Sequence, residues 1–166
     1  MMIITLLLSL MPMAGLFLML LSGVGFIQDT KFFSSAPVEV RNVIKPREER
    51  FKGAHAVGWI MAVFSVLLII GAFMIGAWNG IHNGFGFWQF FIRFIIMILL
   101  LKAFDILFFD WVLLCNAGFN FFPHFYPETK DVLRRYLFGY NWKTHLVHII
   151  GGFAVSALLA WVCTLL

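Results

Sequence analysis

Residues 91–111 read FIRFIIMILLLKAFDILFFDW, an apolar run long enough to cross a membrane that nevertheless contains Arg93, Lys102, Asp105 and Asp110. The hydrocarbon core of a bilayer is about 30 Å thick and takes about 20 helical residues to span. A charge in that core costs roughly 2.5 to 3.5 kcal/mol on insertion scales, so it needs a partner, water or a function. The run therefore predicts a membrane helix with a polar site inside it.

The composition of the whole chain agrees with a membrane location. The chain has 166 residues, of which 62% are hydrophobic and only 12% charged, whereas about 25% are charged in a typical soluble domain. This length leaves no room for a soluble catalytic domain beside the membrane spans. The net charge of +4 does not indicate a nucleic-acid partner, because most basic residues lie in loops between apolar runs. The predicted partner is the lipid bilayer.

Four apolar runs are long enough to span the membrane, over about residues 2–27, 54–78, 87–113 and 144–166. We predict an all-α fold, in which residues 1–166 form one integral membrane domain built as a bundle of four transmembrane helices. The first run has no basic segment before it and a longer apolar stretch than a signal peptide, so we expect it to be retained.

The distribution of Lys and Arg predicts the topology. Basic residues gather in the loops 28–53 and 114–143, and the turn around Asn79–Gly86 has none. Since basic loops stay in the cytoplasm, both loops should be cytoplasmic and both chain termini outside.

The second loop contains an amphipathic segment over residues 128–138. Val132, Leu133, Tyr136 and Leu137 lie on one side of it, with Lys130, Arg134 and Arg135 largely on the other. This pattern predicts a short interfacial helix whose basic side contacts lipid head groups.

Two of the spans show narrow stripes of small or polar residues at helical spacing, which let membrane helices approach closely. In the second span the stripe is His55, Gly58, Ala62, Ser65, Ile69, Ala72 and Gly76. In the fourth it is His145, His148, Gly152, Ser156 and Cys163. We expect both stripes to face the interior of the bundle.

The charges of the third span divide into two groups. At 100° per residue, Lys102 shares an arc of about 140° with Asp105 and Asp110, and Arg93 lies on the opposite side. Lys102 and Asp105 can pair within the helix, whereas Asp110 needs a partner from another element. Arg93 is expected to reach the outer interface.

The predicted depths bring six titratable side chains together in the cytoplasmic leaflet. They are His55, Lys102, Asp105, Asp110, His145 and His148. Histidine and carboxylate groups in such a cluster can pass protons, so our nominal prediction is a carrier or a component of an ion or proton pathway. Because four spans rarely enclose a pathway alone, such a carrier is expected to be a homo-oligomer.

Two other interpretations account for the same residues. The cluster can be a structural ion-pair network in a non-catalytic accessory or structural subunit of a larger membrane complex. It can also be the site of a membrane-embedded enzyme acting on a lipid or other amphiphile, with His145, His148 and Asp110 as metal ligands. No motif specifies a cofactor, and the sequence leaves it open whether any catalysis takes place.

Residues 88–155 carry a loose resemblance. Phe104-Asp105 and Phe109-Asp110-Trp111, followed by Pro127-Glu128-Thr129 and by Lys143 before a glycine-containing span, resemble small four-span bacterial membrane proteins of unassigned function. The resemblance implies no activity, and we expect the membrane to be a bacterial cell membrane.

Overall fold

The computed structural model describes residues 1–33, 36–115, 121–133 and 141–166, and every regular element in these ranges is a helix. Two long helices carry π-helical extensions: α1 (Met2–Leu21) continues as η1 (Ser22–Ile27), and α4 (Phe87–Phe104) continues as η3 (Asp105–Cys115). The other two long helices are α3 (Ala54–His82) and α7 (Trp142–Thr164). The shorter elements are η2 (Thr30–Phe33), α2 (Val38–Val43), α5 (Phe121–Phe125), η4 (Pro127–Thr129) and α6 (Lys130–Leu133).

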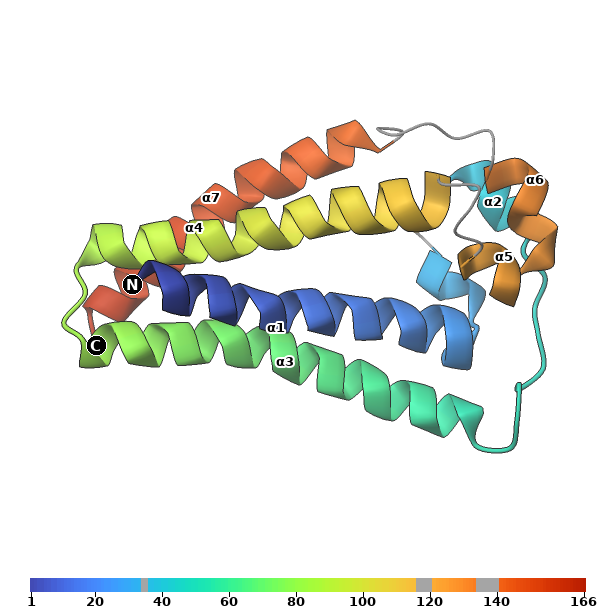
Figure 1. The fold of residues 1–166 in the computed structure, drawn as a ribbon, viewed down its shortest axis with the longest axis horizontal. Helices are drawn as coiled ribbons and strands as arrows, with labels where there is room; N and C mark the ends of the chain where they lie inside the picture. Colours follow the sequence, from blue (N-terminus) through green and yellow to red (C-terminus); the bar gives the residue numbers. More distant parts are fainter. Residues whose placement is uncertain (34–35, 116–120, 134–140) are drawn as a thin grey trace.

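The four long helices run side by side along the long axis of the molecule (Figure 1). The main contacts join α1 to α3, α4 to α7 and α1 to α4. Three of the helices are long and apolar enough to cross a membrane, namely Met2–Ile27, Ala54–His82 and Trp142–Thr164. The segment formed by α4 and η3 is long as well but carries four charged residues.

Small residues let the helices pack closely, as the stripes in the sequence predicted. The stripe of α3 is buried at Gly58, Ala62, Ser65, Ala72 and Gly76. At Gly58 the carbonyl oxygen accepts a 2.7 Å hydrogen bond from the Ser22 hydroxyl of η1. The stripe of α7 is buried at Gly152, Ser156 and Cys163, and a Cβ on Gly152 would lie 2.7 Å from Ile98 Cγ2 of α4.

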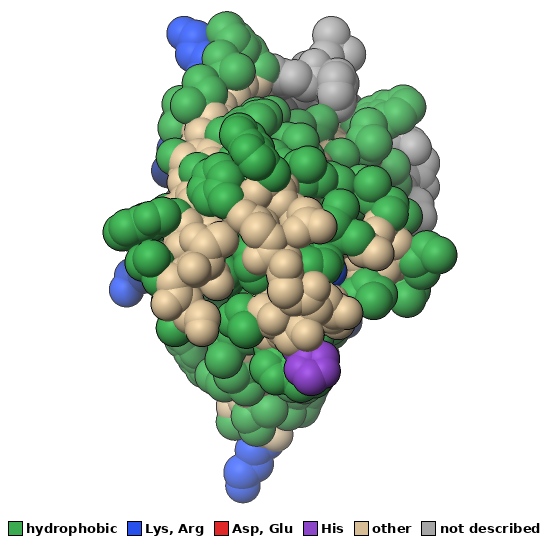
Figure 2. All heavy atoms as spheres, turned by 90° about the vertical axis from the view of Figure 1, so that its left-hand side faces the viewer, with side chains coloured by type: hydrophobic (Ala, Val, Ile, Leu, Met, Phe, Trp, Pro, Cys, Tyr) green, Lys and Arg blue, Asp and Glu red, His purple; other side chains and the backbone are tan. Residues whose placement is uncertain are grey.

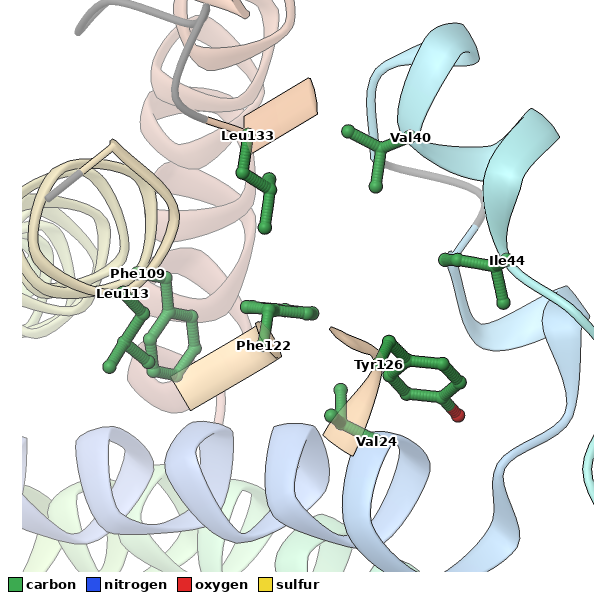
Figure 3. Close-up of a cluster of buried hydrophobic side chains, with 8 residues drawn as sticks. All are labelled: Val24, Val40, Ile44, Phe109, Leu113, Phe122, Tyr126 and Leu133. Carbon is green, nitrogen blue, oxygen red and sulfur yellow. The ribbon is translucent and has the colours of Figure 1, made fainter. Parts of the chain in front are cut away.

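The short elements gather at one end of the bundle around a core of their own. Figure 3 shows this core, which consists of Val24, Val40, Ile44, Phe109, Leu113, Phe122, Tyr126 and Leu133. The aromatic segment before Pro127 therefore packs inward onto η1 and η3, with Phe122 and Tyr126 buried. Of the predicted interfacial helix, the part up to Leu133 is helical, with Leu133 buried and Lys130 exposed. Arg134 and Arg135 lie outside the described residues.

The opposite end of the bundle contains both termini and the turn between α3 and α4 (Figure 1). The face that this end presents is mainly hydrophobic, with no acidic side chain in view (Figure 2). The sequence has no Asp or Glu between residues 50 and 104, nor after residue 131. All eight carboxylates thus belong to the other half of the bundle or to its loops.

The position of the Arg93 side chain differs from the prediction that it would reach the outer interface. Its side chain is fully buried, its Nη1 donates a 2.6 Å hydrogen bond to the Gly76 carbonyl, and its guanidinium lies 4.5 Å from the centre of the Phe85 ring. The prediction failed because the Gly76 carbonyl of α3 and the Phe85 ring give the guanidinium partners inside the bundle.

Candidate functional site

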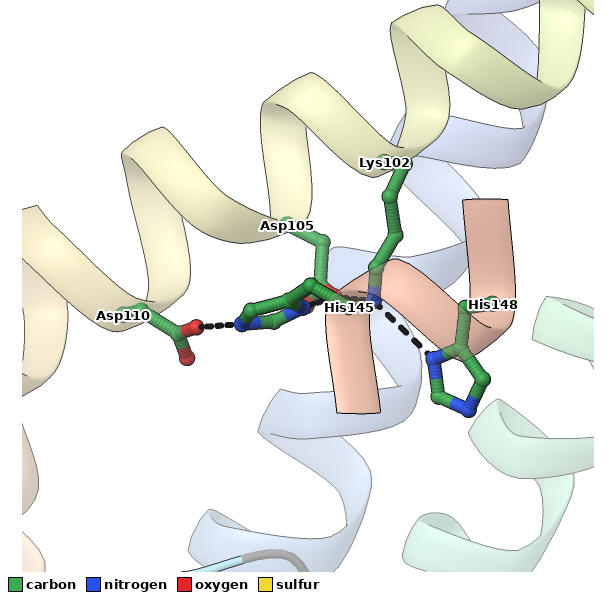
Figure 4. Close-up of polar contacts among 5 residues, drawn as sticks. All are labelled: Lys102, Asp105, Asp110, His145 and His148. Atoms are coloured by element: carbon green, nitrogen blue, oxygen red, sulfur yellow. Dashed lines mark hydrogen bonds and ion pairs between the residues drawn. The ribbon is translucent and has the colours of Figure 1, made fainter. Parts of the chain in front are cut away.

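A row of acidic and basic side chains connects α7 to α4 and η3 (Figure 4). At one end Nε2–H of His145 donates to Asp110 Oδ2 at 2.6 Å, and Nδ1 of the same ring lies 4.0 Å from Asp105 Oδ2. The same Asp105 oxygen accepts a 2.5 Å hydrogen bond from Lys102 Nζ, which also lies 3.2 Å from His148 Nδ1. We refer to these five residues as the polar row.

Asp110 thus has the partner in another helix that its position in the sequence required. The π-helical winding of η3 explains how it meets the same histidine as Asp105. These carboxylates are five residues apart, which in an α-helix would place them about 140° apart around the axis. In a π-helix the backbone bonds run from residue i to i+5 and bring such a pair closer to one side. Both carboxylates accordingly lie within 4.0 Å of a ring nitrogen of His145.

Three members of the polar row are largely removed from solvent. The side chains of Lys102, His145 and Asp110 are 14%, 10% and 11% exposed. Within the described residues, Nδ1 of His145 has no hydrogen-bond partner. A buried nitrogen of this kind is a place where a proton or a water molecule can bind.

Lys102 sets the chemistry of the second histidine. An ammonium group only donates hydrogen bonds, so Nδ1 of His148 is the acceptor in this contact. His148 is exposed on α7 and is the most exposed member of the row.

The polar row lines a cavity of about 240 Å³, which is large enough for several water molecules. The opposite walls are apolar and come from α1, η1, η3 and α5, through Leu20, Val24, Phe109 and Phe122. Asn141 and Thr144 complete the polar side. These last two residues were not predicted as part of the site, although their spacing to His145 and His148 places all four on one side of α7.

His55 does not join the polar row. Its side chain is exposed at the start of α3, its backbone N–H is bonded to Glu49 Oε1 at 3.0 Å, and it is not among the residues that line the cavity. The prediction from depth alone failed because α3 packs on α1, whereas the polar row lies between α4 and α7.

The predicted metal ligands His145, His148 and Asp110 lie in the row but do not face one point. His145 is bonded to Asp110, whereas His148 lies beyond the Lys102 ammonium. Among the described residues, no three His, Cys, Asp or Glu side chains are placed to hold a metal ion. A metal site at these residues remains a prediction.

The arrangement as a whole is suited to holding and moving protons. Each member of the row is within 4.0 Å of the next, and all five members line the cavity. No family model, curated protein or solved structure matches the chain. Its function therefore has to be inferred from its own residues.

Proposed function

We propose that the chain is a four-span membrane protein whose polar row takes up and releases a proton, as the proton site of a carrier or proton pathway. The observation that carries this proposal is the position of His145 between two carboxylates, 2.6 Å from Asp110 and 4.0 Å from Asp105. A proton added at Nδ1 would produce an imidazolium ion with a carboxylate on either side.

The charge balance of the row favours this role. With both histidines neutral, Lys102 offsets one of the two aspartates, and one negative charge remains in a largely buried site. A proton on His145 makes the row neutral. Since unbalanced charge is expensive in an apolar environment, a proton or another cation is the ligand that this site most needs.

The π-helix supports a functional rather than a purely structural row. An ion pair between Lys102 and Asp105 at (i, i+3) spacing forms in an ordinary α-helix and needs no change of winding. The wider turn begins at Asp105 and extends to Cys115. Such segments occur frequently at functional sites because they redirect side chains, and here the redirected group is Asp110.

The proposal also assigns an orientation. If α4 with η3 crosses the bilayer as the fourth span, the two basic loops lie on one side, which should be the cytoplasm. The polar row would then lie in the cytoplasmic leaflet with both termini outside. A reporter fused after Leu166 should be accessible from outside intact cells, and a cytoplasmic reporter would contradict this orientation.

Proton flux into liposomes tests the function. The purified full-length chain is reconstituted with a pH-sensitive dye inside, and an inward proton gradient is applied with valinomycin and K⁺ to prevent charge build-up. We expect faster acidification than in protein-free liposomes, and at least a tenfold lower protein-dependent rate in Asp110→Asn and His145→Gln.

His82→Gln is the matched control, because His82 is exposed at the other end of α3, where it stacks on Trp78. Its rate should equal that of the unmodified protein. Equal rates in protein-free and protein-containing liposomes, or in Asp110→Asn and His82→Gln, would contradict the proposal.

A further inference from the structure

A second cavity, of about 320 Å³, lies at the end of the bundle that carries the basic loops. Its lining residues are Gln28, Arg47, Glu48, Arg50, His124 and Phe125. It is distinct from the cavity of the polar row: Val24 and Phe122 line the first, and Gln28 and Phe125 line the second. Near both cavities η1 contacts α5, and Gly25 lies against the Phe125 ring there.

We propose that this second cavity binds a phosphate group. Three of its six lining residues are basic, and two of these are arginines, whose planar N–H donors match phosphate oxygens in pairs. The proposal is independent of the proton site, because it uses none of the residues of the polar row.

Both arginines are held in place by aromatic rings. The guanidinium carbon of Arg47 lies 5.1 Å from the centre of the Tyr126 ring, and that of Arg50 lies 5.1 Å from the centre of the Phe125 ring. An arginine that stacks through its face keeps the N–H groups on its edge available to other partners. In Arg47 one of these groups already donates to Glu128. Fixing the side chain beforehand also lowers the entropic cost of binding.

The neighbouring carboxylates Glu49 and Glu128 already have partners, and the partner of Glu128 is Arg47 itself. Glu49 accepts hydrogen bonds from the backbone N–H groups of Gly53 and His55 at the start of α3. Glu128 forms a 2.8 Å ion pair with Arg47. Within the described residues, Arg50 has no ion pair, so Arg50 and His124 are the basic groups that a ligand would satisfy, with Glu48 as the one acidic lining residue.

The surrounding charge favours an anion as well. Ten of the twelve Lys and Arg residues and six of the eight Asp and Glu residues belong to the segments 28–53 and 114–143. The whole excess of positive charge in the chain therefore belongs to these two segments of the sequence. Basic residues near a bilayer attract anionic lipids.

The phosphate can belong to a lipid head group or to a soluble anion, and two binding measurements on the full-length chain separate these sources. Native mass spectrometry counts the molecules of dioleoylphosphatidylglycerol, or of dioleoylglycerol, which has the same acyl chains but no phosphate, that the protein retains. A parallel titration with inorganic phosphate measures the rise in melting temperature and the displacement of the retained lipid.

Arg50→Gln is the principal variant, and Lys52→Gln is its matched control. Lys52 is an exposed basic residue of the same segment that does not line the cavity. We expect Arg50→Gln to lower the affinity for the phosphate-bearing probe about five- to tenfold, Arg50→Lys to recover part of it, and Lys52→Gln to leave it unchanged. Helical content measured by circular dichroism shows whether each variant is folded.

The outcomes are distinct. Preferential retention of phosphatidylglycerol that inorganic phosphate does not displace identifies a lipid head group, and saturable binding of inorganic phosphate identifies a soluble ligand. Equal retention of the two lipids together with no effect of inorganic phosphate would overturn the proposal. Equal losses in Arg50→Gln and Lys52→Gln would overturn it as well, because the effect would then be one of general charge.

Discussion

His145 on α7 and Asp110 on η3 are 35 residues apart in the chain, and their side chains meet through a 2.6 Å hydrogen bond in the interior of the bundle. Each residue is 8% exposed. This contact joins α7 to η3, the segment that also contains Asp105. It gives Asp110 the partner that its own helix does not supply.

The His145–Asp110 contact should contribute to stability. Replacing one member leaves the other buried without its partner, which costs about 3 kcal/mol or more. We expect His145→Leu and Asp110→Leu each to lower the free energy of unfolding by about that amount, measured by denaturation in mixed micelles. The double variant should be less destabilised than the sum of the two, and strictly additive effects would show that the side chains do not interact.

The packing of α7 on α4 can be tested with two adjacent glycines. A Cβ at position 152 would lie 2.7 Å from Ile98 Cγ2, whereas a Cβ at position 151 has nothing within 4 Å. Overpacking typically costs about 1–3 kcal/mol, so Gly152→Ala should lower the melting temperature of the protein. Gly151→Ala should not, and equal melting temperatures for the two variants would contradict this packing.

The contact between the two loops should weaken in acid. Glu128 accepts hydrogen bonds from the Lys45 backbone N–H at 3.3 Å and from Arg47 Nη2 at 2.8 Å. Burial raises the pKa of Glu128, but these bonds and the charge of Arg47 outweigh it, so that its pKa lies below the ordinary value.

A carboxyl group with a lowered pKa stabilises the folded state above its unfolded pKa, and this contribution is lost as the pH falls through the folded pKa. Hydrogen exchange at the Lys45 amide, corrected for the intrinsic effect of pH, should therefore show less protection at about pH 3 than at about pH 6. In Glu128→Gln that difference should disappear. Its persistence in the variant would assign the change to another group.

The helices and their inward faces follow from local sequence patterns. Residues recurring at three- and four-residue spacing predicted an inward stripe of α3 from His55 to Gly76. The prediction is confirmed for the small residues from Gly58 to Gly76, which are buried, and wrong for His55, which is exposed. The pairing of Lys102 with Asp105 is confirmed for the same reason, since it depends only on helical spacing. The need of Asp110 for a partner outside its helix could also be inferred from the cost of an isolated charge.

The remaining features depend on contacts between distant parts of the chain. The π-helix at Asp105 changes the direction of Asp110, and a helical wheel drawn with α-helical winding throughout does not reveal it. Arg93 is buried because the Gly76 carbonyl of another helix accepts a hydrogen bond from it. The separation of His55 from the polar row likewise depends on which helix α3 packs against.

The protonation state of His145 is the most direct test of the proposed proton site. In the full-length chain, labelled with ¹⁵N-histidine and placed in lipid nanodiscs, NMR can distinguish a neutral imidazole from an imidazolium, with His145→Gln identifying the signal. We predict a neutral ring protonated at Nε2 at high pH, which becomes an imidazolium as the pH is lowered, and a clear change of this transition in Asp110→Asn. A ring that stays neutral at every pH at which the protein is folded, or a transition that Asp110→Asn leaves unaltered, would contradict the proposal.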